Sequence, residues 1–82
     1  MSIWDEIQAE RERQDKKWGG PSHDDEHTNH DWVSFIVKHV GGGVMWPWDP
    51  KKFRFSMVRV AALAVAAIEW CDRPSPHPPA HD

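Results

Sequence analysis

The sequence predicts an all-α fold, a small three-helix bundle with a long Ala-rich C-terminal helix and a disordered Pro-rich tail. Apolar residues recur at helical spacing in three segments, and turn or helix-stop residues separate these segments. No segment of useful length shows the alternation of polar and apolar residues that is typical of a strand. With 82 residues the chain is expected to form one helical domain, residues 1–73, followed by a tail, residues 74–82.

The first helix is predicted to begin after Ser2, which can cap it together with Asp5 in a shortened capping box. Gly19, Gly20 and Pro21 are typical of a helix end. The predicted inner face consists of Ile3, Trp4, Ile7, Arg11, Gln14 and Trp18.

The second helix is predicted to be short, with Thr28 or Asn29 as its cap and Asp31 in its first turn. Glycines 41–43 should end it. The predicted inner face consists of Trp32, Phe35, Ile36, His39 and Val40.

The third helix is predicted over residues 50–72, because Asp49 is a suitable N-cap and Pro50 suits the first helical position. Five alanines between residues 61 and 67 favour a helix and permit close approach by another helix. We expect it to be the central element, antiparallel to the first helix, with the second helix crossing both. Its predicted inner stripe consists of Phe53, Met57, Val60, Ala61, Ala64, Val65, Ile68 and Cys71.

The charge is uneven along the chain. The net charge of −3 predicts no general attraction to nucleic acid. Residues 1–31 hold nine acids and four bases, whereas residues 32–82 hold four acids and six bases. An acidic half suits a basic protein surface, including one that normally holds nucleic acid, and the alternative is an ordinary solvated helix face.

Cysteine usage and hydropathy predict a cytoplasmic protein. Cys71 is the one cysteine, which excludes a disulfide within the chain and is typical of a reducing compartment. The longest apolar run, residues 57–68, is too short to span a bilayer, so we expect no membrane association. So short a chain needs help from a metal or a partner subunit, and six tryptophans make a homodimer plausible. A small tryptophan core is the alternative.

The stretch PSHDDEHTNHDW, residues 21–32, concentrates three histidines and four acids. Imidazole and carboxylate groups suit zinc or another transition metal. The interpretation that we favour is that Asp24 and Asp25 accept hydrogen bonds from backbone donors of a turn, so no metal and no cofactor are expected. Cys71, between two acids, is expected to be a small buried side chain and not a nucleophile. The weaker metal candidates are His23, His27 and His30.

Four ordered motifs carry a resemblance to known proteins: ERERQDKKWGG (10–20), HDDEH (23–27), WPWD (46–49) and MVRVAALAVAAIEWCDR (57–73). Together they resemble a family of small phage and prophage proteins, over roughly residues 6–73. That family has no assigned activity. The resemblance implies an accessory protein that acts on host machinery, and anti-CRISPR proteins share its small size and acidic character.

A wider resemblance is to the MazG-like nucleotide pyrophosphohydrolases of phages, whose first helix also reads ERxRQxxKWG before a His-containing loop. Those enzymes hold magnesium with an EExxE-like pattern on the second helix and a further acid on the third. Here the second helix, WVSFIVKHVGGG, has no acid after Asp31, and the acid of the third helix falls near Ser56 and Met57. The resemblance implies a shared helical scaffold without those ligands.

We therefore expect a non-enzymatic, phage-type binding protein without catalytic residues. It is expected to inhibit a host protein or nucleoprotein defence complex, in the manner of an anti-CRISPR protein, by occluding a nucleic-acid-binding surface. The alternatives are a MazG-like nucleotide-binding or pyrophosphohydrolase-related protein and a zinc-stabilised domain. The expected partner contacts are Glu6, Glu10, Asp24, Asp25, Glu26, Trp46 and Trp48.

Overall fold

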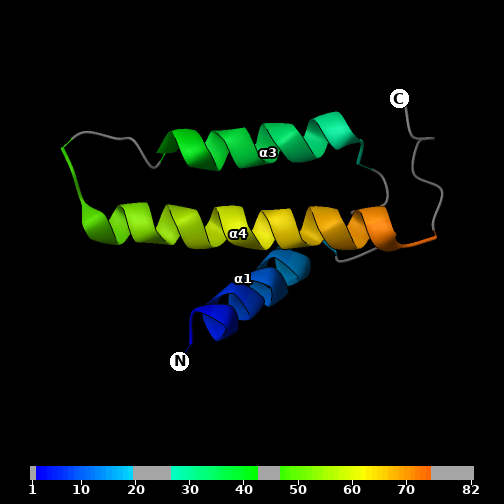
Figure 1. Cartoon of the computed structure of the whole chain (residues 1–82), viewed down its shortest axis with the longest axis horizontal. Helices are drawn as coiled ribbons and strands as arrows, with labels where there is room; N and C mark the ends of the chain where they lie inside the picture. Colours follow the sequence, from blue (N-terminus) through cyan, green and yellow to red (C-terminus); the bar gives the residue numbers. More distant parts are fainter. Residues whose placement is uncertain (1, 20–26, 43–46, 75–82) are drawn as a thin grey trace.

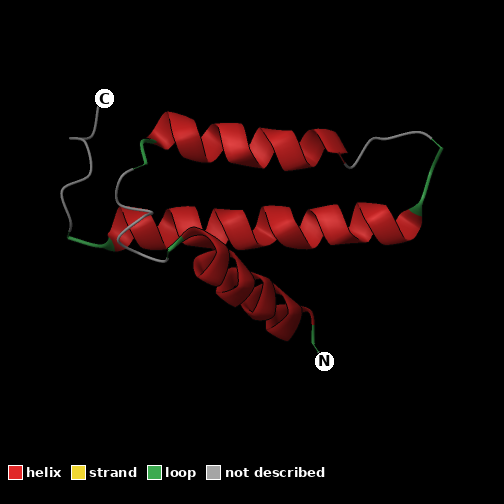
Figure 2. Cartoon of the chain, turned by 180° about the vertical axis from the view of Figure 1, so that it is seen from behind, coloured by secondary structure: helices red, strands yellow, loops and turns green. Residues whose placement is uncertain are grey.

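The computed structural model describes residues 2–19, 27–42 and 47–74. Within these ranges it contains three helices, α1 (Ile3–Trp18), α3 (Asn29–Gly42) and α4 (Pro50–Asp72), and no strand (Figure 2). The predicted all-α fold is therefore confirmed. None of the described helices combines the length and the apolar character that a membrane span requires. Residues 75–82 of the predicted tail lie outside the described residues.

α3 and α4 lie side by side and antiparallel, and α1 crosses α4 obliquely (Figures 1 and 2). α4 packs against both other helices, which confirms it as the central element. The predicted arrangement, with the first and third helices antiparallel, is wrong. Trp32 and Ile36 of α3 offer α4 a large apolar surface, whereas the buried face of α1 is formed by polar side chains such as Arg11 and Gln14.

Local capping fixes the beginnings of α1 and α4, as predicted. The Ser2 hydroxyl accepts a hydrogen bond from the Asp5 backbone N–H at 3.1 Å, and Asp5 in turn accepts one from the Ser2 N–H. Gly19 ends α1 with a φ of 95°, a left-handed conformation that glycine adopts at little cost. Asp49 caps α4 by accepting from the N–H of Lys51 at 3.0 Å.

The start of α3 is fixed by a reciprocal pair of hydrogen bonds. The Thr28 N–H donates to Asp31 at 2.9 Å, and the Asp31 N–H donates to the Thr28 hydroxyl at 3.3 Å. Of the two predicted caps, Thr28 is therefore the one used. These hydrogen bonds also hold the pKa of Asp31 below its usual value, because the Thr28 backbone N–H stabilises the carboxylate.

The apolar core lies between α3 and α4. Trp32 packs against Leu63, Ala66 and Trp70, and the rings of the two tryptophans are centred 6.3 Å apart. Ile36 and Ala67 extend this cluster. Each large side chain that is withdrawn from water contributes about 1.5–3 kcal/mol, so the tryptophans and Leu63 supply most of the apolar stabilisation. This core positions Trp32, which also lines the candidate site.

The predicted inner face of α1 is confirmed in part, and that of α4 is wrong. On α1, Arg11 and Gln14 are buried as predicted, whereas Ile3 and Trp4 are exposed, Trp4 by 78%. On α4, the buried residues are Ala62, Leu63, Ala66 and Trp70, and not the predicted stripe, whose member Ile68 is 60% exposed. Cys71, expected to be buried, is also exposed. α4 is apolar around most of its circumference, so helical spacing alone fits more than one face.

Candidate functional site

A pocket of about 200 Å³ opens between α1 and α3, with Leu63 and Ala66 of α4 at its base. Three kinds of side chain surround it: aromatic rings, buried polar groups and cationic groups near its edge. The remaining lining residues are Arg11, Gln14, Asp15, Trp18, His27, Trp32, Phe35, Lys38 and His39.

Aromatic rings form the α3 side of the pocket. His27 makes an edge contact with Trp32, at 5.4 Å between ring centroids, and another with Phe35, at 5.1 Å. Its Nδ1 lies 3.9 Å from the Asp31 carboxylate. Trp18, at the end of α1, also lines the pocket, and the Lys17 ammonium lies 5.2 Å from the centre of its ring. Planar surfaces therefore approach the pocket from two helices.

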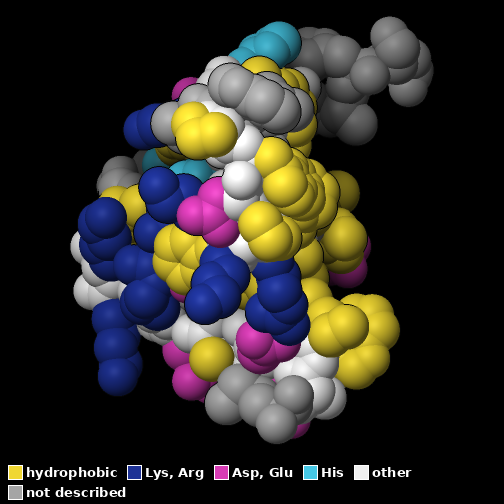
Figure 3. All heavy atoms as spheres, turned by 90° about the vertical axis from the view of Figure 1, so that its left-hand side faces the viewer, with side chains coloured by type: hydrophobic (Ala, Val, Ile, Leu, Met, Phe, Trp, Pro, Cys, Tyr) yellow, Lys and Arg dark blue, Asp and Glu magenta, His cyan; other side chains and the backbone are white. Residues whose placement is uncertain are grey.

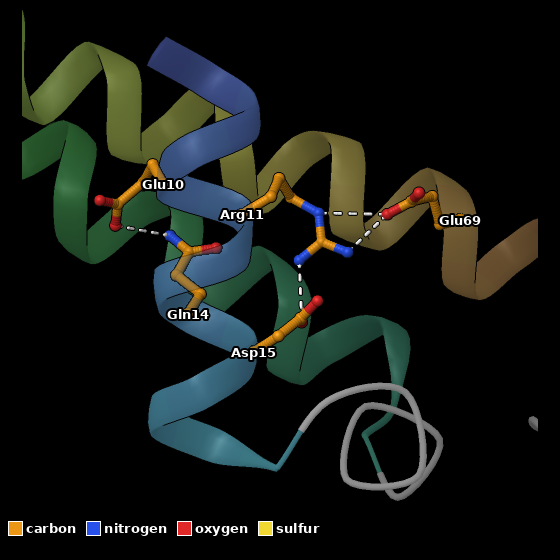
Figure 4. Close-up of polar contacts among 5 residues, drawn as sticks. All are labelled: Glu10, Arg11, Gln14, Asp15 and Glu69. Carbon is orange, nitrogen blue, oxygen red and sulfur yellow. Dashed lines mark hydrogen bonds and ion pairs between the residues drawn. The ribbon is translucent and has the colours of Figure 1, made fainter. Parts of the chain in front are cut away.

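Gln14 and Trp32 line the pocket, and each also carries a buried polar atom without a partner. Both residues are only 4% exposed, and neither the Gln14 Oε1 nor the Trp32 Nε1 has a hydrogen-bond partner among the described residues. The Gln14 amide is oriented by Glu10, since its Nε2 donates to that carboxylate at 3.2 Å and its oxygen points away (Figure 4). One acceptor and one donor are thus buried without a partner in residues that line the pocket, and both atoms are themselves covered from the pocket in this conformation.

Arg11 joins α1 to α4 beside the pocket. Its Nη2 donates to Glu69 at 2.6 Å, its Nε donates to the same oxygen at 3.1 Å, and its Nη1 donates to Asp15 at 3.1 Å (Figure 4). Burial acts to lower the pKa of Arg11, but the hydrogen bonds to Glu69 and Asp15 outweigh it and leave the pKa raised. The Arg11 guanidinium therefore stays positively charged and holds α1 against α4 beside the pocket.

A second polar cluster lies on the other side of Gln14. Arg13 donates to Glu10 at 2.8 and 2.6 Å, and this pairing lowers the pKa of the buried Glu10 carboxyl.

Burial lowers the pKa of His39, and the nearby charges of Arg59 and Lys38 lower it further. His39 is therefore neutral at pH 7 and able to donate and accept one hydrogen bond each.

Two of the predicted partner contacts are engaged within the chain. Glu6 binds the guanidinium of Arg54 on α4, and Glu10 binds Arg13. Trp48 is 57% exposed, with its ring centred 5.3 Å from that of Phe53. The other predicted contacts, Asp24, Asp25, Glu26 and Trp46, lie outside the described residues.

The charge of the described residues differs from that of the whole chain. All ten Lys and Arg side chains lie within them, but only nine of the thirteen acids do. The acidic excess of the sequence therefore belongs to residues 24–26 and Asp82. An acidic binding surface of the expected kind would have to be built largely from residues 24–26.

The candidate metal ligands are only partly covered by the structure. His27 packs against aromatic rings and His30 is exposed, whereas His23 lies outside the described residues. Within residues 2–19, 27–42 and 47–74, no group of three or more His, Cys, Asp or Glu side chains is placed to hold a metal ion.

Sequence reasoning missed the pocket although it named several of its residues. Arg11, Gln14 and Trp18 were predicted on the inner face of the first helix, and His39 on that of the second. The signal in the sequence was the presence of polar residues at positions expected to face a core, because buried polar groups generally need a partner.

Comparisons with protein families, curated proteins and solved structures gave no match.

Proposed function

We propose that this chain is a binding protein whose pocket between α1 and α3 takes the base of a nucleotide or a closely similar planar anionic ligand. The observation that carries the proposal is that two residues of this aromatic-lined pocket, Gln14 and Trp32, each hold a buried polar atom without a partner, Gln14 Oε1 and Trp32 Nε1, which a turn of the side chain would present to a ligand. A buried polar atom without a partner costs about 1–3 kcal/mol, and a ligand that satisfies it recovers that energy.

The chemistry of the lining supports a nucleobase. Once the Gln14 and Trp32 side chains turn toward the pocket, their acceptor and donor complement the donor and acceptor atoms along a base edge, and Trp18 and Phe35 offer rings for stacking, worth about 1–3 kcal/mol per base. A volume of about 200 Å³ is below the roughly 300–1,000 Å³ of pockets for drug-sized ligands. We therefore propose that the base enters the pocket and the phosphates stay outside, near Lys38.

The resemblance to MazG-like proteins points to the same class of ligand, and the proposal separates binding from hydrolysis. Magnesium catalysis needs clustered carboxylates, whereas α3 lines the pocket with two rings and with the basic Lys38 and the neutral His39. Incubation of nucleoside triphosphates with the protein and Mg²⁺ or Mn²⁺, followed by a pyrophosphate assay, tests this point. Pyrophosphate release that Asp24→Asn abolishes would replace the binding proposal with an enzymatic one.

The binding test compares two glutamines of the same helix. We expect nucleotide titrations, followed by calorimetry and by tryptophan fluorescence, to show binding that Gln14→Leu weakens about tenfold, because one hydrogen bond worth about 1.4 kcal/mol is lost. Gln8→Leu is the matched control, since Gln8 is exposed. Absence of binding by every common nucleotide at millimolar concentration, or equal affinity of the two variants, would refute the proposal.

Inhibition of a host defence complex is the second candidate. The exposed Trp48 ring supports it, because exposed tryptophans are typical of interface hot spots. The test is whether the protein prevents a purified CRISPR effector complex from binding its DNA target, with the double variant Trp46→Ala, Trp48→Ala as comparison. Full DNA binding at saturating protein, or equal inhibition by the variant, argues against these contacts.

A further inference from the structure

α4 has a second apolar face, turned away from its contacts with α1 and α3 and only partly covered. Its members follow each other at spacings of four, three, four and four residues, which is close to the repeat of a helix–helix seam. Within that face, Phe53 and Ile68 are exposed and the others are partly buried. The residues are Phe53, Met57, Val60, Ala64 and Ile68.

α3 adds a parallel row of apolar side chains. Val33, Val37 and Val40 are all exposed, Val37 by 61%, at spacings of four and three residues. They lie on one flank of α3, roughly 80–140° around the helix from the core residue Trp32. The opposite flank, with Lys38, lines the pocket beside α1.

The two rows share one side of the molecule, away from α1. On α4, Glu69 marks the side that meets α1 and Leu63 marks the side that meets α3. At 100° per residue, Ala64 lies about 140° from Glu69, and Val60 lies beyond Leu63 in the direction away from Glu69. Figure 3 shows hydrophobic side chains gathered on one side of the molecule and Lys and Arg side chains on the other.

We propose that this α3–α4 face binds the same face of a second copy of the chain, so that two antiparallel helix pairs form a four-helix bundle. Eight residues, none of them charged, make up the face: Val33, Val37, Val40, Phe53, Met57, Val60, Ala64 and Ile68. A neutral apolar surface can meet its own copy without opposing like charges, whereas it offers nothing to a partner selected by charge. Spacings of three and four residues are those that four-helix bundles use.

The size of the face approaches that of a dimer interface. α4 has 23 residues and α3 has 14, so the two helices are about 34 Å and 21 Å long, and each presents a strip about 10 Å wide. The flat area is about 550 Å² before side-chain relief is added, and a standard interface buries about 800 Å² per partner. One chain buries few apolar side chains by itself, and small domains of this kind need a second source of stabilisation.

This dimer would leave the pocket open, because α1 lies on the opposite side of the α3–α4 layer. The inference therefore does not depend on the identity of any ligand. It places two outward-facing pockets on one symmetric assembly.

Sedimentation and light scattering of the full chain test the proposal. We expect a mass of about 19 kDa, twice the 9.5 kDa of one chain, at micromolar concentration. Val37→Glu and Ile68→Glu should each weaken association at least about 100-fold, because a carboxylate would be buried without a partner. Phe55→Glu is the control: Phe55 is also exposed and apolar, but it lies on α4 about 180° from Ala64, in the groove facing α1.

Three results would overturn the proposal: a mass of 9.5 kDa at all concentrations up to about 1 mM, dimers of unchanged affinity in both face variants, or equal dissociation by Phe55→Glu. If a face variant does not fold, the unfolding midpoint of the natural chain, measured at several protein concentrations, tests for the dimer instead. A midpoint that rises with protein concentration supports the dimer, and a constant midpoint contradicts it.

Discussion

Replacing Arg11 by methionine should loosen α1 from α4 while keeping most of the apolar stem of the side chain. Glu69 and Asp15 each accept hydrogen bonds from the guanidinium, but their side chains are 53% and 36% exposed. Solvent screening therefore limits each ion pair to about 0.2–1 kcal/mol. With the partial loss of stem packing, we expect a total of about 1.5 kcal/mol.

Urea and thermal unfolding, followed by circular dichroism at one fixed protein concentration, measure this loss. For a chain of this size, about 1.5 kcal/mol lowers the melting temperature by roughly 6–12 °C. Lys16→Met is the matched control, because Lys16 is exposed on the same helix, and it should change stability by less than about 0.5 kcal/mol. A variant Arg11→Met as stable as this control would refute the inference that these ion pairs hold α1 in place.

Two further measurements concern α3. Burial, Arg59 and Lys38 lower the pKa of His39 from 6.5, so the unfolded chain binds its proton more readily than the folded one. Stability should therefore be lost as the pH falls from about 6.5, and His39→Asn should reduce this slope between pH 7 and 5; an identical slope would contradict the burial argument. Thr28→Ala removes one half of the Thr28–Asp31 cap and should cost about 1 kcal/mol in urea unfolding, whereas Ser34→Ala, on an exposed position, should have little effect. Equal losses would show that the cap is not what fixes the start of α3.

Features that depend on neighbouring residues were predictable from the sequence. The caps at Ser2 and Asp49, and the helix end at Gly19, each need only side chains and backbone groups within three or four residues. The bounds of α4 therefore match the prediction. Long-range pairing was not predictable in this way, since the sequence does not say which helix α1 or α3 will meet.

α4 shows why the pairing was mispredicted. The stripe through Met57 and Ala64 and the stripe through Leu63 and Trp70 both have helical spacing. Helical spacing therefore predicts burial of either stripe equally well, and which one is buried depends on the helix that packs against it. In the structure the large Trp70 ring meets Trp32, so the Leu63 stripe is buried. Five of the eight residues of the predicted stripe form the α4 part of the face that we assign to a second copy of the chain.

The two proposals place different demands on α3, and these demands are compatible. Trp32 faces the core and the pocket, while Val37 lies on the flank assigned to the second copy. Because α1 and α3 both pack mainly on α4, a ligand held between Gln14 and Trp32 would add a direct link between these two helices. Such a ligand at about 100 times its Kd would add about 2.7 kcal/mol to stability, by binding only the folded chain. The dimer would instead act on the other side of α4, so each contribution can be measured while the other is held constant.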